Sequence, residues 1–318
     1  MPSPLLGAEL LKAAERKAAA QRAAERGEEL PPPRESQSPP ELRGDLRPAG
    51  VQIMDAPTAG IESAETIPPV DGLGNFQCLK VSPDPQSRLV CLRDKESLAA
   101  EKFRFLGVRL RQLRQSRPLK KVLITSTIPQ EGKSIVAANL ACTLASRTQQ
   151  RTLLVDGDLR RPCQAQLFGL GTTPGLSEWL QGERGPLTSI YRLEETPLWI
   201  LPAGSTPQNP LEVMQSGALS AVVDQLATWF DWIVIDSPPV LPLADTSVWM
   251  RLADGIVLVT REGTTERAQL QRGLEAIEPA KLLGAIVNGA ASAARNDHYY
   301  HYHYRPAAPT QPASSVEN

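Results

Sequence analysis

A short apolar run, a tight loop and a helix-forming stretch follow one another over residues 122–139. The loop ends in Gly132-Lys133-Ser134, so backbone N–H groups and the positive end of the following helix converge on one point. This arrangement binds phosphate: the lysine adds a point charge for the β- and γ-phosphates, and the serine hydroxyl can ligate Mg²⁺. The usual first glycine of the GxxxxGK[ST] pattern is replaced by Thr127. The residues predicted to contact the nucleotide are Thr127, Gln130, Glu131, Gly132, Lys133, Ser134 and Ile135.

Two acidic motifs follow two other apolar runs. Asp156 and Asp158 come after one run and are followed by Arg160, and Asp236 closes the next, before Ser-Pro-Pro. Unpaired carboxylates at strand ends are costly, and a metal ion or a substrate proton would explain them. An aspartate such as Asp236 can hold Mg²⁺ through its water shell. Each motif alone could be a helix cap or a surface acid, but the three motifs in this order indicate a nucleotide site.

Strand-like and helical patterns alternate through the middle of the chain. The predicted strands are 121–126, 152–156, 197–202, 231–236, 255–260 and 283–288, and the predicted helices are 133–147, 210–229, 244–252 and 266–279. Near-continuous Val, Ile and Leu runs are typical of strands covered on both faces. The pattern predicts an α/β fold of the P-loop NTPase class, with a mainly parallel sheet and helices on both faces. In such sheets ligands bind at the carboxyl ends of the strands.

Composition divides the chain into four zones. Residues 1–30 have a helix-favouring mixture of Ala, Glu, Lys and Arg, and the proline-rich residues 31–75 are predicted to be a flexible linker. Residues 76–292 form the predicted P-loop domain, and residues 293–318 a disordered tail rich in Tyr and His. The formal net charge of −1 gives no sign of nucleic-acid binding.

Cysteine usage and hydropathy bear on the cellular compartment. The four cysteines are scattered without a CxxC pair, which fits a reducing compartment. No apolar run reaches the roughly 18–20 residues needed to span a bilayer, and the N-terminus has no signal-peptide pattern. We therefore expect a cytoplasmic protein.

The three motifs resemble those of the bacterial tyrosine kinases of capsule and exopolysaccharide systems, and look like that family's Walker A, A′ and B motifs. The likeness covers about residues 95–290 and includes Leu201-Pro-Ala-Gly204 and Leu241-Pro-Leu-Ala-Asp245. The resemblance implies a stand-alone, ATP- and Mg²⁺-dependent protein tyrosine autokinase with a fold like that of MinD and ParA. It also implies a role in regulating polysaccharide polymerisation or export.

The resemblance also implies roles for individual residues. Lys133 and Ser134 would bind phosphates and Mg²⁺. Asp156 and Asp158 would assist the attacking tyrosine hydroxyl and the metal, and Asp236 would complete the Mg²⁺ site. Asn288 resembles the family's adenine contact, although an asparagine that caps the turn at a strand end explains it equally well.

Four of the five tyrosines lie together near the C-terminus, at Tyr299, Tyr300, Tyr302 and Tyr304. The family carries such clusters, which implies that these are the phosphoacceptors. All three histidines, His298, His301 and His303, are interleaved with them, so weak transition-metal binding is an alternative. An aromatic tail without a role is a further alternative.

The sequence departs from the family pattern in three respects. Gln130 replaces the glycine that usually follows Pro129, which restricts the backbone. The family's oligomerisation helix keeps Glu101 and Arg104, so self-association could use them, but its last arginine is Gly107. The chain has no membrane segment. The resemblance therefore implies an activator in trans, a membrane chain-length determinant or polysaccharide co-polymerase, which recruits the kinase to the plasma membrane, and a cognate tyrosine phosphatase.

Two other functions stay open on the sequence. A MinD/ParA-type ATPase switch shares the fold, but such proteins usually place a second lysine where this chain has Ile128. A non-catalytic adaptor of a polysaccharide export complex would bind ATP and dock through residues 1–30 or the tail. Phosphorylation of the tail tyrosines distinguishes the kinase from both.

Overall fold

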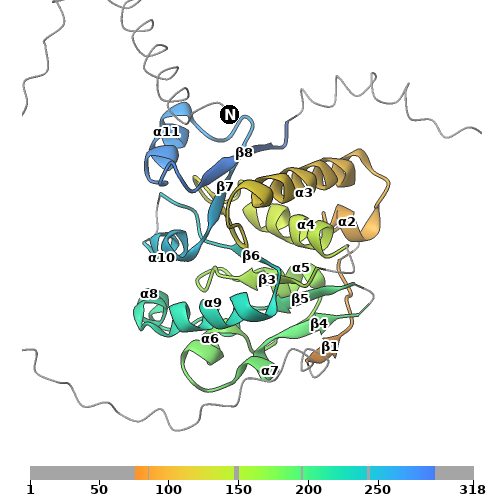
Figure 1. Ribbon diagram of the computed structural model, residues 1–318, viewed down its shortest axis with the longest axis vertical. Coiled ribbons are helices and arrows are strands. Elements are labelled where there is room, and N and C mark those ends of the chain that lie inside the picture. The colour runs from red at the N-terminus through yellow and green to blue at the C-terminus, as the bar shows by residue number, and fades with distance from the viewer. Residues whose placement is uncertain (1–75, 85, 147–149, 195, 242–243, 291–318) are drawn as a thin grey trace, which may run out of the picture. The chain divides into compact units, whose positions relative to one another are not determined.

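The computed structural model describes residues 76–84, 86–146, 150–194, 196–241 and 244–290 (Figure 1). The predicted N-terminal zones 1–30 and 31–75 and the tail 293–318 lie outside the described residues.

An eight-stranded sheet runs through the predicted P-loop domain. Its strands are β1 (Gln77–Leu79), β2 (Lys121–Ser126), β3 (Thr152–Asp156), β4 (Tyr191–Leu193), β5 (Leu198–Leu201), β6 (Trp232–Asp236), β7 (Gly255–Arg261) and β8 (Leu282–Asn288). Their order is β1-β4-β5-β3-β6-β2-β7-β8 (Figure 1). Neighbouring strands are parallel except for the antiparallel pair β4 and β5. The prediction of a mainly parallel sheet is confirmed, with all six predicted strands present.

Helices connect the strands. They are α2 (Val90–Arg93), α3 (Leu98–Ser116), α4 (Lys133–Ala145), α5 (Gln164–Phe168), α6 (Leu176–Leu180), α7 (Pro186–Ser189), α8 (Pro210–Gln215), α9 (Ala218–Trp229), α10 (Asp245–Leu252) and α11 (Arg267–Glu275). Within the described residues, no helix is both long and apolar enough to span a bilayer.

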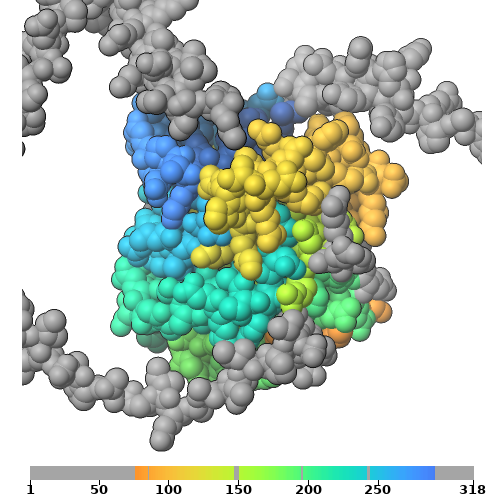
Figure 2. Space-filling model, in the orientation of Figure 1, coloured from red at the N-terminus to blue at the C-terminus, as the bar shows by residue number. Residues whose placement is uncertain are grey.

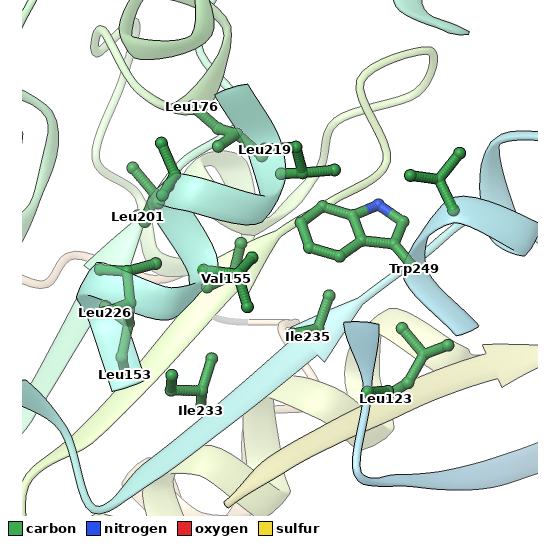
Figure 3. Close-up of a cluster of buried hydrophobic side chains, with 14 of the residues drawn as sticks. Leu123, Leu153, Val155, Leu176, Leu201, Leu219, Leu226, Ile233, Ile235 and Trp249 are labelled. Atoms are coloured by element: carbon green, nitrogen blue, oxygen red, sulfur yellow. The ribbon is translucent and has the colours of Figure 1, made fainter. Parts of the chain in front are cut away.

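The strands bury side chains on both faces, which explains their continuous apolar runs. In β6, Ile233 and Ile235 pack into a core with Trp249 of α10 (Figure 3). Val234, between them, belongs to the core on the opposite face, which α3 and α4 cover. On the first face, α8 and α9 form a band across the surface in Figure 2. The sheet is thus covered on both sides, as the sequence predicts.

The prediction of a single helix over residues 210–229 was wrong, because this segment forms two helices. Gly217 lies between α8 and α9 with a φ of 82°, in the left-handed region. A right-handed helix cannot continue through that conformation, which glycine adopts at little cost. The apolar period continues across the break, so the hydrophobic pattern alone did not reveal it. Of the short elements, β1, β4, α2 and α5 to α7 were not predicted, and the helix α3 was implied only by the family resemblance.

The strand order brings the three motifs together. In β2, Ile124 is in register with Asp236 of β6, and Asp236 is in register with Asp156 of β3. Parallel strands end at the same edge of a sheet, so the loop between β2 and α4, residues 127–132, lies beside both aspartates. We call these residues the nucleotide loop, after the predicted ligand. The sheet therefore builds one site from segments far apart in the sequence.

Candidate functional site

The loop between β2 and α4 has the shape of a phosphate cradle. Gly132, the residue before α4, has a φ of 93°. The backbone conformation favours glycine, and a Cβ at Gly132 would lie 2.1 Å from the Nδ2 atom of Asn288, so a larger residue would also displace the Asn288 side chain. α4 begins at Lys133 without a side-chain cap, so the N–H groups of its first turn are available to stabilise an anion in the loop.

Side chains outside the loop fix its conformation. The buried Glu131 carboxylate accepts a hydrogen bond from the Ile128 N–H at 2.8 Å and another from the Thr265 hydroxyl. Asn288 donates from Nδ2 to the Glu131 carbonyl at 2.9 Å. The structure therefore places Asn288 at the nucleotide loop; the predicted adenine contact stays a prediction. Gln130 has a φ of 67°, the only positive value among the described non-glycine residues.

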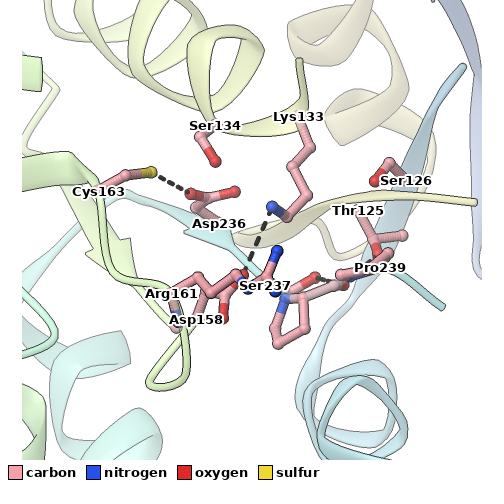
Figure 4. Close-up of polar contacts among 12 residues, drawn as sticks. Thr125, Ser126, Lys133, Ser134, Asp158, Arg161, Cys163, Asp236, Ser237 and Pro239 are labelled. Carbon is pink, nitrogen blue, oxygen red and sulfur yellow. Dashed lines mark hydrogen bonds and ion pairs between the residues drawn. The ribbon is translucent and has the colours of Figure 1, made fainter. Parts of the chain in front are cut away.

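Lys133 points from the start of α4 toward the acidic motifs (Figure 4). Its Nζ atom lies 3.5 Å from Oδ2 of Asp158, and the two side chains are only 14% and 4% exposed. Burial lowers the pKa of Lys133, but the carboxylates of Asp236 and Asp158 outweigh it, so the pKa is raised overall. The lysine is therefore charged at neutral pH.

Asp156 and Asp236 form a buried, like-charged pair. Oδ2 of Asp156 accepts hydrogen bonds from the Cys163 and Gln164 N–H groups at 2.9 and 2.8 Å. Burial, followed by the nearby charge of Asp236, raises the pKa of Asp156 to about 7. Burial also raises the pKa of Asp236, against the effect of Lys133. A site with this excess of negative charge favours a cation.

Gln164 is a site residue that the sequence analysis missed. Its Nε2 atom donates to Oδ2 of Asp236 at 2.9 Å and to the carbonyl of Ser134 at 3.1 Å. Both partners are acceptors, so the amide orientation is fixed and Oε1 faces away from them. Gln164 thus joins all three motifs, since its N–H group also binds Asp156. Its position shortly after the Asp-x-Asp-x-Arg motif was the only signal in the sequence.

Cys163, beside Gln164, was also missed. Its Sγ atom lies 3.8 Å from Oδ2 of Asp236 (Figure 4). Burial, followed by the charges of Asp236 and Asp156, raises the pKa of Cys163 to about 12. The thiol is therefore neutral at physiological pH, which suits its position next to carboxylates.

The oxygen atoms of the site fit Mg²⁺. Among the described residues, Oδ1 of Asp236 is buried without a hydrogen-bond partner, and the Ser134 hydroxyl lies against Asp236. In the same part of the chain, no three His, Cys, Asp or Glu side chains converge into a closed metal cage. Mg²⁺ typically takes only one or two carboxylates and completes its shell with waters and phosphate. An open oxygen site beside a phosphate cradle has that character.

α10 holds the segment that carries Asp158. Arg160 donates to both oxygens of Asp245, from Nε at 2.6 Å and Nη2 at 3.1 Å. Trp249 Nε1 donates to the Gly157 carbonyl at 3.0 Å, and the Gly157 N–H donates to the Asp236 carbonyl at 2.8 Å. Two contacts from one helix therefore flank the aspartate that pairs with Lys133.

Arg160→Ala is expected to lower the free energy of unfolding by about 2 kcal/mol, because the Asp245 carboxylate, 1% exposed, loses its bidentate partner. The arginine side chain is 38% exposed, which places the effect below that of a fully buried pair. Urea unfolding of the full-length variant measures it. Arg161→Ala, at the exposed neighbouring position, is the matched control, and an equal loss in that variant would contradict the assignment.

The structure brings most of the predicted site residues together: Lys133, Ser134, Asp156, Asp158, Asp236 and Asn288 surround the loop. Glu101 and Arg104 lie instead on α3, where they pair with each other at 2.6 Å. The predicted phosphoacceptors Tyr299, Tyr300, Tyr302 and Tyr304 lie outside the described residues.

The sequence and the fold are similar to those of known proteins, although no family model matches the chain. It is 33% identical over 218 residues to tyrosine-protein kinase YwqD of Bacillus subtilis, covering 68% of this chain and 92% of that protein. It is 32% identical to the putative tyrosine-protein kinase CapB of Staphylococcus aureus, covering 65% and 91%. It is also 35% identical to the succinoglycan biosynthesis transport protein ExoP of Rhizobium meliloti, of which it covers 25%.

Solved structures agree with these similarities. The crystal structure of the chimerical protein CapA2B2 has a TM-score of 0.60 at 30% identity, with 68% of this chain and 95% of that chain covered. The tyrosine kinase domain of BceF has a TM-score of 0.56 at 27% identity, covering 69% and 85%. YwqD is 33% identical to this chain and is matched over 92% of its own length, and the three motifs meet at one edge of the sheet. The chain therefore belongs to the bacterial tyrosine kinase family.

Proposed function

We propose that this chain is an ATP- and Mg²⁺-dependent protein tyrosine autokinase that phosphorylates its own C-terminal tyrosine cluster and regulates exopolysaccharide or capsule production. The observation that carries the proposal is the buried pair of Lys133 and Asp158 beside a phosphate cradle. A phosphate-binding cation and a potential proton acceptor therefore lie next to one another. Family membership supports the choice of a protein tyrosine as the acceptor.

The site residues have distinct roles in this proposal. Lys133 and the N–H groups at the start of α4 bind the phosphates and neutralise charge that develops during transfer. Ser134 and Asp236 would hold Mg²⁺, since Oδ1 of Asp236 is buried without a hydrogen-bond partner among the described residues. When bound, the metal would neutralise negative charge on the phosphates.

Asp158 is the better candidate for the group that receives the tyrosine proton. Its Oδ1 atom is held by the Arg161 N–H at 3.0 Å, and its Oδ2 atom faces Lys133. A tyrosine hydroxyl, with a pKa near 10, needs such an acceptor as transfer proceeds. Oδ2 of Asp156 accepts from two backbone N–H groups, and Oδ1 accepts a longer hydrogen bond from the Asp158 N–H at 3.4 Å. We therefore assign Asp156 to positioning the loop, with Oδ1 as the oxygen that would face the metal.

Family membership supports the choice of partners. We propose a membrane-bound polysaccharide co-polymerase as an activator in trans, a cognate tyrosine phosphatase, and self-association through α3 with Glu101 and Arg104. The similarity to ExoP, named as a succinoglycan biosynthesis transport protein, supports a connection with polysaccharide transport. In this proposal the kinase works in the cytoplasm, at the inner face of the plasma membrane.

The proposed phosphorylation of the tail can be tested because the tyrosines are unevenly distributed along the chain. The chain has five, and the one outside the tail, Tyr191 in β4, is 3% exposed with its hydroxyl bound to the carbonyls of Pro174 and Thr188. Incubation with ATP, Mg²⁺ and the activator's cytoplasmic segment is expected to label only the tail. A variant with phenylalanine at Tyr299, Tyr300, Tyr302 and Tyr304 is expected to lose all phosphotyrosine in mass-spectrometric mapping.

The same experiment separates the alternatives. ATP hydrolysis without any tyrosine modification, even with the activator segment, would favour an ATPase switch. Nucleotide binding with neither hydrolysis nor transfer would favour the adaptor. Labelling of Tyr191 in the four-phenylalanine variant would show a different acceptor and would refute the tail assignment.

A further inference from the structure

One segment outside the three motifs contacts the nucleotide loop at several points. Residues 261–266 and α11 lie beside β8 at one edge of the sheet (Figure 1). From this segment, the Thr265 hydroxyl binds the Glu131 carboxylate and Arg261 Nη1 donates to the Gln130 carbonyl at 3.3 Å. The backbone of α11 at Gly273 lies against Thr127. We call residues 261–273 the outer brace.

The brace contacts the loop positions at which this chain is unusual. Gln130 stands at the family's usual glycine position, yet its backbone adopts the left-handed conformation that glycine favours. A non-glycine residue stays in that conformation only where its surroundings over-determine it. The hydrogen bond from Arg261 to its carbonyl and the contacts of the adjacent Glu131 provide such surroundings.

Glu131 is held at both carboxylate oxygens. Its side chain is fully buried, so each oxygen needs a donor, and these are the Ile128 N–H and the Thr265 hydroxyl. The Thr265 hydroxyl in turn accepts from the Arg261 N–H at 3.0 Å. The loop and the brace are therefore connected through a continuous chain of hydrogen bonds.

Thr127 and Gly273 are complementary in size. Thr127 stands where the pattern usually has glycine, and its buried hydroxyl has no hydrogen-bond partner in the described part of the chain. A Cβ at Gly273 would lie 3.1 Å from Cγ2 and 3.2 Å from Oγ1 of Thr127, closer than ordinary contact distances. The missing side chain at Gly273 thus makes room for the larger residue in the loop.

We infer that Thr265 and Gly273 are positioning residues, which hold the nucleotide loop in its binding conformation in place of the missing loop glycines. The inference rests on the proposed nucleotide site. When the contacts of Thr265 or the space at Gly273 are removed, the loop occupies its binding conformation for a smaller fraction of the time. The apparent affinity for ATP then falls in proportion to the population of that conformation. Turnover of the bound complex changes little, because neither residue reaches the acidic motifs.

The test measures binding of a fluorescent ATP analogue with Mg²⁺ to the full chain, together with KM for ATP and kcat for tyrosine phosphorylation. Thr265→Val and Gly273→Ala are each expected to weaken binding and raise KM about tenfold, with kcat within twofold. Thr265→Ser, which keeps the hydroxyl that binds Glu131, is expected to bind within threefold of the wild type. Arg272→Ala, on the exposed side of α11, is the control.

Each outcome is decisive. Unchanged binding in Thr265→Val, or binding by Thr265→Ser as weak as that of Thr265→Val, would overturn the positioning role of the outer brace while leaving the nucleotide site intact. A parallel fall in kcat, or equal weakening in Arg272→Ala, would indicate a general structural defect and also overturn it. Failure of the wild-type chain to bind the analogue would refute the proposed nucleotide site, and the brace with it.

Discussion

Lys133→Ala is expected to lower tail phosphorylation on the order of 10³-fold. The side chain is nearly buried between the loop and the acidic motifs, 3.5 Å from Asp158. Removing a preorganised positive group from a site where charge develops typically costs two to three orders of magnitude in rate. In this site the loss is compounded, because the carboxylates of Asp158 and Asp236 would then face the phosphates without that cation. Phosphotyrosine mapping after phosphatase pretreatment measures the effect.

Two further variants make the Lys133 result specific. Lys102→Ala removes an exposed lysine of α3 and is expected to leave labelling unchanged. Lys133→Arg keeps the charge but places a planar, larger group in a confined position, so it is expected to recover only a small part of the activity. Equal labelling of Lys133→Ala and the wild type would refute the assignment of this loop as the phosphate site.

Asp236→Asn is expected to stabilise the nucleotide-free protein while abolishing Mg²⁺-dependent phosphorylation. Asp236 is fully buried next to Asp156, and its Oδ1 atom has no hydrogen-bond partner among the described residues. An asparagine can keep the oxygen that accepts from Gln164 and remove the charge. At pH 8 we expect Tm to rise by about 5 °C, equivalent to roughly 2 kcal/mol for a domain of this size.

The stabilisation should depend on pH with a definite sign. Burial raises the pKa of both carboxyl groups in the folded state, that of Asp156 to about 7 from an ordinary 3.8. The folded state therefore binds these protons more tightly than the unfolded state, so wild-type stability falls as pH rises from about 4 through about 7. The gain from Asp236→Asn is accordingly expected to be largest above pH 7 and to vanish near pH 4.

Thermal unfolding over this pH range, without nucleotide, checks the prediction. Asp224→Asn removes an exposed carboxylate of α9 and is expected to change stability by less than about 0.5 kcal/mol. A destabilised Asp236→Asn at pH 8 would show that the carboxylate is needed for folding rather than for function. Retained Mg²⁺-dependent labelling would remove Asp236 from the metal site.

The motifs and the main strands were predictable because their signals are local. A buried parallel strand requires a continuous apolar run, and a phosphate loop requires glycine and lysine at fixed positions, so 121–126 and Gly132-Lys133 were visible directly. The break at Gly217 was not, since the apolar period continues across it. The adenine role of Asn288 stays a prediction: the sequence offered adenine binding or turn capping, and the structure adds its bond to the loop.

By itself the sequence determined the class of sheet, the phosphate loop and the three carboxylates, because each depends on residues adjacent in the chain. Only the tertiary structure decided which hydrogen-bond partners and packing contacts hold these groups in place. Gln164 joins the motifs, and α10 and the outer brace hold the loops, through contacts between segments distant in sequence. Such contacts depend on strand order and side-chain direction. The local sequence around a polar residue such as Gln164 or Thr265 does not indicate which distant group it will bind in the folded protein.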